Sequence, residues 1–133
     1  MIEIRGDQMA ALQRATEARF AAELADFLRR RCAAALDGLD AAEVAALVAR
    51  GIAMARAAGF TWQRSIAQYV TLLVELGPDW ARHPAIATRL GWVQGAGEYR
   101  LGELVAATPP DLWRDVADPD RAAALRALLR EAA

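Results

Sequence analysis

The stretch from Arg50 to Trp80 limits most strongly how this chain can fold. It reads as a helix that stops at Gly59, a tight turn, and a second helix that stops at Gly77-Pro78. Glycine readily adopts the left-handed conformation that ends many helices, and proline cannot continue a helix. Apolar residues recur at three- and four-residue steps before each stop, which is the period of one helix face. These two stripes are Val44, Leu47, Val48, Ile52 and Ala55, then Ile66, Tyr69, Val70, Leu73 and Leu76.

A third apolar stripe precedes these two and predicts a long first helix. Its members are Met9, Leu12, Thr16, Phe20, Leu24, Phe27 and Leu28. Asp7 is suited to cap this helix, and Gly38 marks its end. We therefore expect a helix over about residues 7–36, preceded by an extended arm over residues 1–6.

Capping signals set the expected starts of the next two helices. Asp40 is followed by Glu43 at the spacing of a capping box. Thr61 is a good N-cap for the helix that follows it. The expected helices cover about residues 40–58 and 62–76.

The C-terminal half has a weaker pattern. Glycines cluster in residues 91–102, so we expect a flexible loop over 91–97, followed by short helices. Thr108 and Asp118 each precede proline and are predicted to cap two of them. With 133 residues, the chain fits one domain, and we predict a single all-α domain over residues 1–133.

Composition and charge narrow the classes of partner. The net charge is -1, which argues against nucleic acid and against a polybasic membrane contact. No apolar run is long enough to span a membrane and the N-terminus lacks a signal pattern, so we expect a cytoplasmic protein. All sixteen basic residues are arginine. GC-rich coding explains this bias, and arginine recognition of carboxylates is the alternative.

The residues that could perform chemistry form no recognisable constellation. Cys32 is the only cysteine, His83 the only histidine and Ser65 the only serine, and none lies in a catalytic or metal-binding motif. Arginines beside Cys32 could lower the pKa of its thiol, although a buried inert thiol is the simpler interpretation. The acidic residues between Asp111 and Asp120 lack the spacing of a calcium loop. We predict no catalytic residue, no metal and no cofactor, and therefore a protein that is not an enzyme.

Four tryptophans fall near predicted helix ends or loops. They either cover the ends of an alanine-rich core or contribute to an interface, where Trp, Tyr and Arg dominate binding energy. The tentative protein-binding residues are Trp62, Arg64, Trp92, Tyr99, Arg100 and Trp113.

Two groups of residues carry a resemblance to a known family. The first group is Ile2, Ile4, Arg5, Gln8, Leu12, Ala18, Arg19 and Phe20. The second is Gly51-Ile52, Ala55-Arg56, Gly59-Phe60-Thr61, Arg64, Tyr69-Val70 and Leu76-Gly77-Pro78-Asp79. Through them, roughly the first 85 residues resemble small helical proteins encoded in bacterial type VI secretion loci. The family motif usually ends Gly-Pro-Asp-Phe-Asp, whereas this chain has Trp80 and Ala81 in the last two positions.

The resemblance implies no particular reaction. It implies neighbouring genes that encode secreted toxins, spike or carrier proteins, adaptors and immunity proteins. We expect a non-enzymatic adaptor or chaperone that binds an effector or its carrier. An immunity protein that inhibits a cognate toxin is the alternative, and a small secreted effector is a more distant one. An inhibitor would use an acidic and aromatic patch such as Asp111 to Asp120 with Trp113, whereas an adaptor would use apolar helix faces and the glycine-rich loop.

If the glycine-rich segment is the interface, Trp92→Ala and Arg100→Ala should each lower affinity for the partner, because truncating an aromatic or arginine hot spot costs about 2 kcal/mol or more. Calorimetric titration with the purified partner measures the change. Unchanged affinity in both variants would contradict the interface in this segment.

Overall fold

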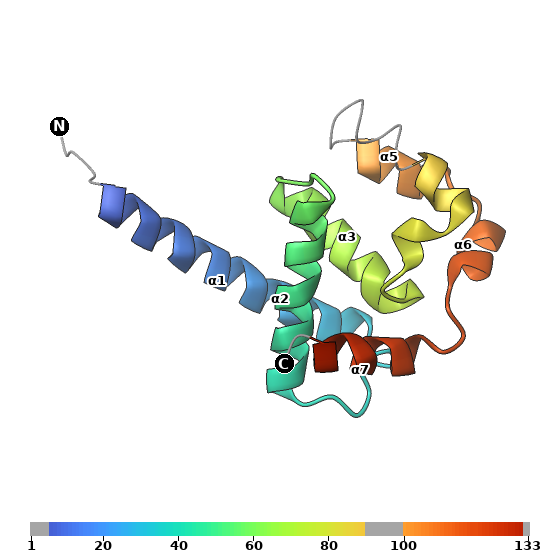
Figure 1. Ribbon diagram of the computed structural model, residues 1–133, viewed down its shortest axis with the longest axis horizontal. Coiled ribbons are helices and arrows are strands. Elements are labelled where there is room, and N and C mark those ends of the chain that lie inside the picture. The colour runs from blue at the N-terminus through green and yellow to red at the C-terminus, as the bar shows by residue number, and fades with distance from the viewer. Residues whose placement is uncertain (1–5, 90–99, 132–133) are drawn as a thin grey trace.

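Every regular element that the structure describes is a helix. The structure is a computed structural model that describes residues 6–89 and 100–131 (Figure 1). The elements are α1 (Gly6–Arg31), α2 (Ala41–Ala57), α3 (Gln63–Leu76), the 3₁₀ helix η1 (Trp80–Arg82), a short helix over 84–89, α5 (Arg100–Ala107), α6 (Pro110–Val116) and α7 (Arg121–Glu131). The prediction of an all-α fold is confirmed. The predicted loop over 91–97 and most of the predicted arm lie outside the described residues, while Gly6 already belongs to α1.

The capping box predicted at the start of α2 is present. The backbone N–H of Glu43 donates to Asp40 Oδ1 at 2.8 Å, and the backbone N–H of Asp40 donates to Glu43 Oε1 at 3.1 Å. These two bonds satisfy backbone donors that have no partner within the helix. At the other end of α2 the chain reverses at Gly59, whose φ is 99°.

The inner face of α3 is buried as the apolar stripe predicts. Ile66, Tyr69, Val70, Leu73 and Leu76 are each at most 8 % exposed. The start of the helix differs from the prediction, because the N-cap is Trp62 and its side chain makes no capping hydrogen bond. Helix α3 therefore begins one residue later than expected, at Gln63.

Helix α1 ends earlier than predicted, at Arg31 rather than near residue 36. The chain then turns through backbone hydrogen bonds that span three residues instead of four. The N–H of Asp37 donates to the oxygen of Ala34, and the N–H of Leu39 donates to the oxygen of Leu36. These turns bring Leu36 into the core, where it is 5 % exposed. Burial of Leu36 thus outweighs continuation of the helix.

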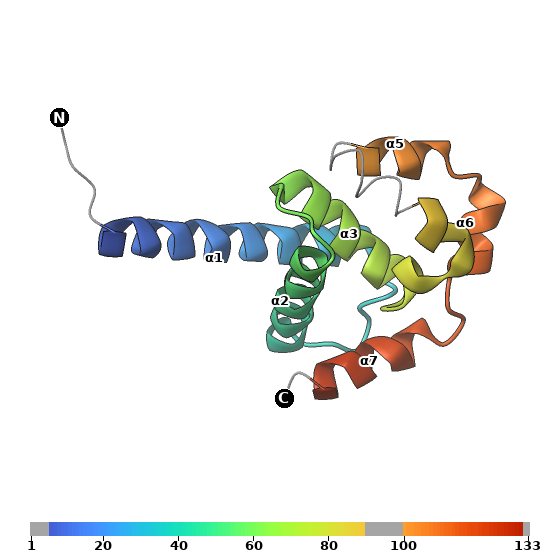
Figure 2. The same cartoon turned by 45° about the horizontal axis from the view of Figure 1, so that its top comes forward.

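The core lies where α1, α2 and α3 meet, and α7 packs against α2 and α3. Its largest fully buried side chains include Trp80, Phe60, Leu28, Leu47 and Leu73. Two views show that the first half of α1 projects away from the rest of the molecule (Figures 1 and 2). The remainder of the described chain gathers around the second half of α1.

Phe27 does not belong to the buried stripe of α1, contrary to prediction. Its neighbours Leu24 and Leu28 are at most 4 % exposed, whereas Phe27 is 43 % exposed. Leu24 and Leu28 are four residues apart and therefore share one face of α1, whereas Phe27 lies to the side of that face.

Thr108 ends α5 instead of capping α6, which corrects the predicted role. Its hydroxyl donates to the backbone oxygen of Leu104 at 2.6 Å. The N-cap of α6 is Pro109, which makes no side-chain capping bond. Asp118 does bond the backbone ahead of α7, where its Oδ1 accepts the N–H of Asp120 at 2.8 Å.

Two glycines in the left-handed region allow a matched test of chain reversal. Gly77 has φ of 113°, and an added Cβ would lie 3.1 Å from Asp118 Cβ. Gly59 has φ of 99°, but an added Cβ would meet no atom within 4 Å. Gly59→Ala should lose about 1–2 kcal/mol for its positive φ. Gly77→Ala should lose about 1 kcal/mol more, because its ψ of 160° lies in a region essentially restricted to glycine and the new Cβ overpacks against Asp118. Denaturant unfolding of both variants gives the difference, and equal losses would contradict the additional cost at Gly77.

Candidate protein-binding groove

Two large hydrophobic side chains in the described part of the chain are exposed. Phe27 on α1 is 43 % exposed, and Trp62 at the start of α3 is 51 % exposed. A single exposed hydrophobic residue needs no explanation, but exposed hydrophobic residues beside linked hollows make a candidate interaction site. Both residues line hollows on the same side of α3.

The first hollow is a largely apolar cavity of about 400 Å³ between α1, α3 and α5. Its lining residues are Phe27, Arg31, Arg64, Ala67, Gln68, Thr71, Leu72 and Val105. The members from α3 recur at positions i, i+3, i+4, i+7 and i+8, so they form one continuous face of that helix. This face is the floor, and residues of α1 and α5 form the walls.

The second hollow continues the first toward the start of α3. It has a volume of about 360 Å³ and is lined by Trp62, Arg64, Ser65, Gln68, Gly102, Glu103 and Ala106. Arg64 and Gln68 line both hollows, so the two hollows adjoin each other along α3. We call the two hollows together the α3 groove.

The packing of α5 explains why the groove remains open. Leu101 and Leu104 are buried, at 0 % and 8 % exposure. Gly102 and Ala106 lie on another face of α5, where they line the second hollow. Val105 is four residues after Leu101 and partly buried, and it lines the first hollow at the edge of the core. Since the inner face of α3 is fully used in the core, the groove is lined by the adjoining flank of the helix, which includes the buried Ser65 and Leu72.

The charges at the apolar end of the groove are positive. Arg31 Nε lies 3.3 Å from Glu75 Oε1, whereas Arg64 forms no ion pair with any side chain that the structure describes. None of the described lining residues of the apolar cavity is acidic. Glu103 lines only the second hollow, on the α5 side.

Cys32 lies just beyond Arg31 and is buried, with 6 % exposure. Its Sγ is 3.6 Å from Glu75 Oε1, the same oxygen that Arg31 contacts. Desolvation by burial, followed by the charge of Glu75 and the hydrogen bond to it, raises the pKa of the thiol to about 11. The positive charge of Arg31 lowers it less, so the pKa shifts upward rather than downward as the neighbouring arginines could have suggested.

His83 acts as a local cap, the ordinary role expected for a lone histidine beside proline. Its Nδ1 accepts the backbone N–H of Ala85 at 3.2 Å. It lines a further hollow of about 400 Å³ with Leu76, Asp79, Trp80, Arg82, Val116 and Asp118. The indole N–H of Trp80, which also lines it, has no acceptor within the described part of the chain.

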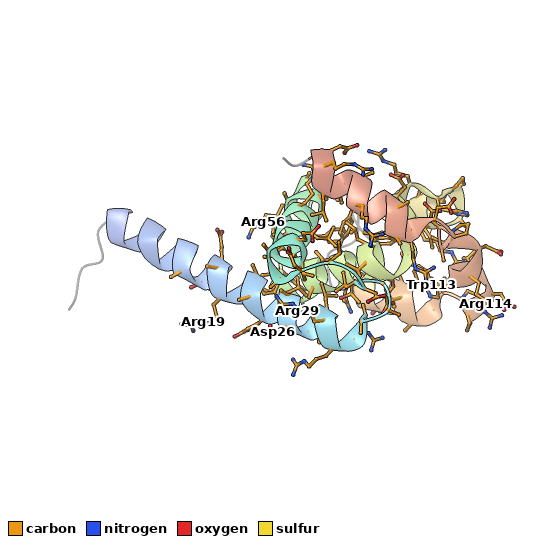
Figure 3. The ribbon with its side chains drawn as sticks, turned by 90° about the horizontal axis from the view of Figure 1, so that it is seen from below. Arg19, Asp26, Arg29, Arg56, Trp113 and Arg114 are labelled. Atoms are coloured by element: carbon orange, nitrogen blue, oxygen red, sulfur yellow. The ribbon has the colours of Figure 1, made fainter. Side chains whose placement is uncertain are left out.

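The structure places only some of the predicted binding residues together. Trp62 and Arg64 both line the α3 groove. Trp113 is half-buried against the core and is absent from the described lining of the groove. Figure 3 shows Trp113 beside Arg114, at the end of the molecule opposite the free end of α1. Trp92, Tyr99 and the side chain of Arg100 lie outside the described residues.

Comparison of the chain with protein-family models, with curated proteins and with solved structures gives no match. Among residues 6–89 and 100–131, no helix is both long enough and apolar enough to cross a membrane. Over the same ranges, no group of three or more His, Cys, Asp or Glu side chains is placed to hold a metal ion.

Glu75→Gln should lower the pKa of Cys32 below about 11, because the variant removes the negative charge beside the thiol. In the wild-type protein the unfolded thiol ionises near its ordinary pKa of 9.0, before the folded one. The contribution of Cys32 to stability is therefore complete below pH 9.0 and falls as the pH rises toward about 11.

The Cβ chemical shift of labelled Cys32, followed against pH, measures this pKa directly. Glu103→Gln is the matched control, because Glu103 lines the other hollow and is not among the groups that shift Cys32. A pKa that stayed near 11 in Glu75→Gln would contradict the role of Glu75.

Proposed function

We propose that this chain is a non-enzymatic accessory protein that binds another protein through the α3 groove. The observation that carries the proposal is the pair of exposed aromatic side chains, Phe27 and Trp62, beside two linked hollows. Aromatic and arginine residues near a concave surface supply most of the binding energy in protein interfaces. Arg64, which lines both hollows, adds the charged component.

The nature of the partner comes from the sequence resemblance. Small helical proteins of type VI secretion loci accompany toxins, spike proteins and other carriers, so a secreted effector or its carrier is the proposed partner. The chain would act in the cytoplasm as an adaptor or loading chaperone for that partner.

The character of the exposed surfaces favours an adaptor over an immunity protein. The acidic segment expected for a toxin inhibitor is partly neutralised, because Asp111 Oδ1 lies 3.2 Å from Arg114 Nη1. Its aromatic residue, Trp113, is half-buried. The first hollow of the α3 groove is instead largely apolar and bordered by Arg31 and Arg64, which fits the use of helix faces expected of an adaptor.

The test is capture of the partner from native cells by tagged wild-type protein and by Phe27→Gln and Trp62→Gln variants. Each variant should reduce capture at least tenfold, because each removes about 1.5–3 kcal/mol of apolar burial at the interface. Both side chains are exposed, so the thermal midpoint should change little. Quantitative mass spectrometry of the captured material gives the reduction.

Arg19→Gln and Arg114→Gln are the matched surface controls. Both arginines are exposed and lie outside the described lining of the groove. Equal capture by wild type and by both groove variants would refute binding through the groove. When a toxin is captured, protection of cells from that toxin distinguishes an inhibitor from an adaptor, while growth inhibition by the chain alone would indicate an effector.

A further inference from the structure

We infer that the α3 groove receives a single amphipathic helix of the partner, with apolar side chains on one face and carboxylates beside them. This inference rests on the proposed function, since it names what the groove recognises. It follows from three properties of the groove: the state of its backbone groups, the shape of its floor and the sign of its charge.

The floor of the apolar cavity leaves an extended peptide nothing to pair with. Its residues from Ala67 to Leu72 lie in the interior of α3, where the backbone groups are bonded within the helix. An extended segment entering the apolar cavity would bury its own N–H and C=O groups without partners, at a large cost for each. A helix carries its own backbone bonds, so only its side chains must fit the groove.

The floor of the groove matches the dimensions of a helix face. Its α3 residues run from Arg64 to Leu72, which corresponds to about 12 Å, or slightly more than two turns. Ala67 and Thr71 lie one helical turn apart within this run and are small, so they permit close approach of another helix. Phe27 and Val105 stand on opposite walls, where they can contact the apolar face of the occupant.

The charge of the apolar cavity selects the sign of the occupant's flanking residues, whereas Glu103 lines only the second hollow. Arg31 and Arg64 line the apolar cavity, and its described lining has no carboxylate. Arg64 is the stronger of the two candidates to bind an incoming carboxylate, since Arg31 already contacts Glu75 at 3.3 Å. Arginine suits this task because its planar guanidinium can hold a carboxylate with two parallel bonds. A basic helix would meet repulsion at the same positions.

The experiment uses three synthetic peptides of equal length and identical leucine spacing, titrated into the full ¹⁵N-labelled chain. The first is a helix stapled on its polar face with Glu beside the leucines, and the second carries Lys in place of Glu. The third is the Glu peptide without a staple and with two central prolines, which prevent the helix. The expected result is that the Glu helix shifts the amide signals of Ala67, Gln68, Thr71 and Leu72. The Lys helix should bind about tenfold more weakly, and the proline peptide should cause no shifts.

Two groove variants and one control locate the effect. Arg64→Gln should weaken binding of the Glu helix about three- to fivefold and reduce its advantage over the Lys helix, as expected for an exposed ion pair. Ala67→Met, which fills the floor, should weaken both stapled helices about tenfold or more. Arg114→Gln should change neither, because Arg114 lies outside the described lining and pairs with Asp111.

Equal affinity for all three peptides, shifts confined to another surface, or no binding of the Glu helix would overturn the inference. A dimer of the chain alone that Ala67→Met dissociates in analytical ultracentrifugation would also overturn it, because the groove would then hold a second copy. If native partner capture still depends on Phe27 and Trp62 in any of these cases, the proposed function stands and only the identity of the occupant is wrong.

Discussion

The close approach of α2 and α3 at Gly51 and Val70 determines how the rest of the molecule is arranged. A Cβ on Gly51 would lie 3.1 Å from both Cγ atoms of Val70, so the valine packs directly over the glycine. This contact lets the two apolar stripes meet along their length, and both become buried. The inner face of α3 packs against α2 and the core. The adjoining side of α3 is therefore bordered by α1 and α5.

Much of the fold follows from local signals in the sequence. The stripes of α2 and α3, the box of Asp40 with Glu43, and the left-handed glycines Gly59 and Gly77 all act through residues close to one another in the chain. Such signals act in any tertiary context that keeps the helices, which is why they could be predicted. One error occurs where a distant contact decides, because Leu36 leaves the helix to enter the core. The other is a choice between two local bonds, because the hydroxyl of Thr108 bonds the oxygen of Leu104 four residues back instead of capping α6.

The candidate site was only partly accessible from sequence. Trp62 and Arg64 could be selected because their residue types are common in interfaces. Phe27 could not, since a phenylalanine in a helical stripe ordinarily belongs to the core. Whether it is buried depends on how closely α3 and α5 pack beside α1, and no local pattern contains that arrangement. The presence of a second wall likewise depends on α5, which lies about 30 residues beyond the floor in sequence.

The origin of the groove walls has a consequence for the order of events during synthesis. The floor belongs to α3 and one wall to α1, but the other wall belongs to α5, which is made last of the three. A nascent chain that has completed only α1 to α3 has the arginines and Phe27 but lacks Val105 and Ala106. Under the proposed function, recognition through the complete groove would require a molecule whose C-terminal half has docked. Occupancy would in turn favour that docked state by mass action and would couple the stability of α5 to the supply of the partner.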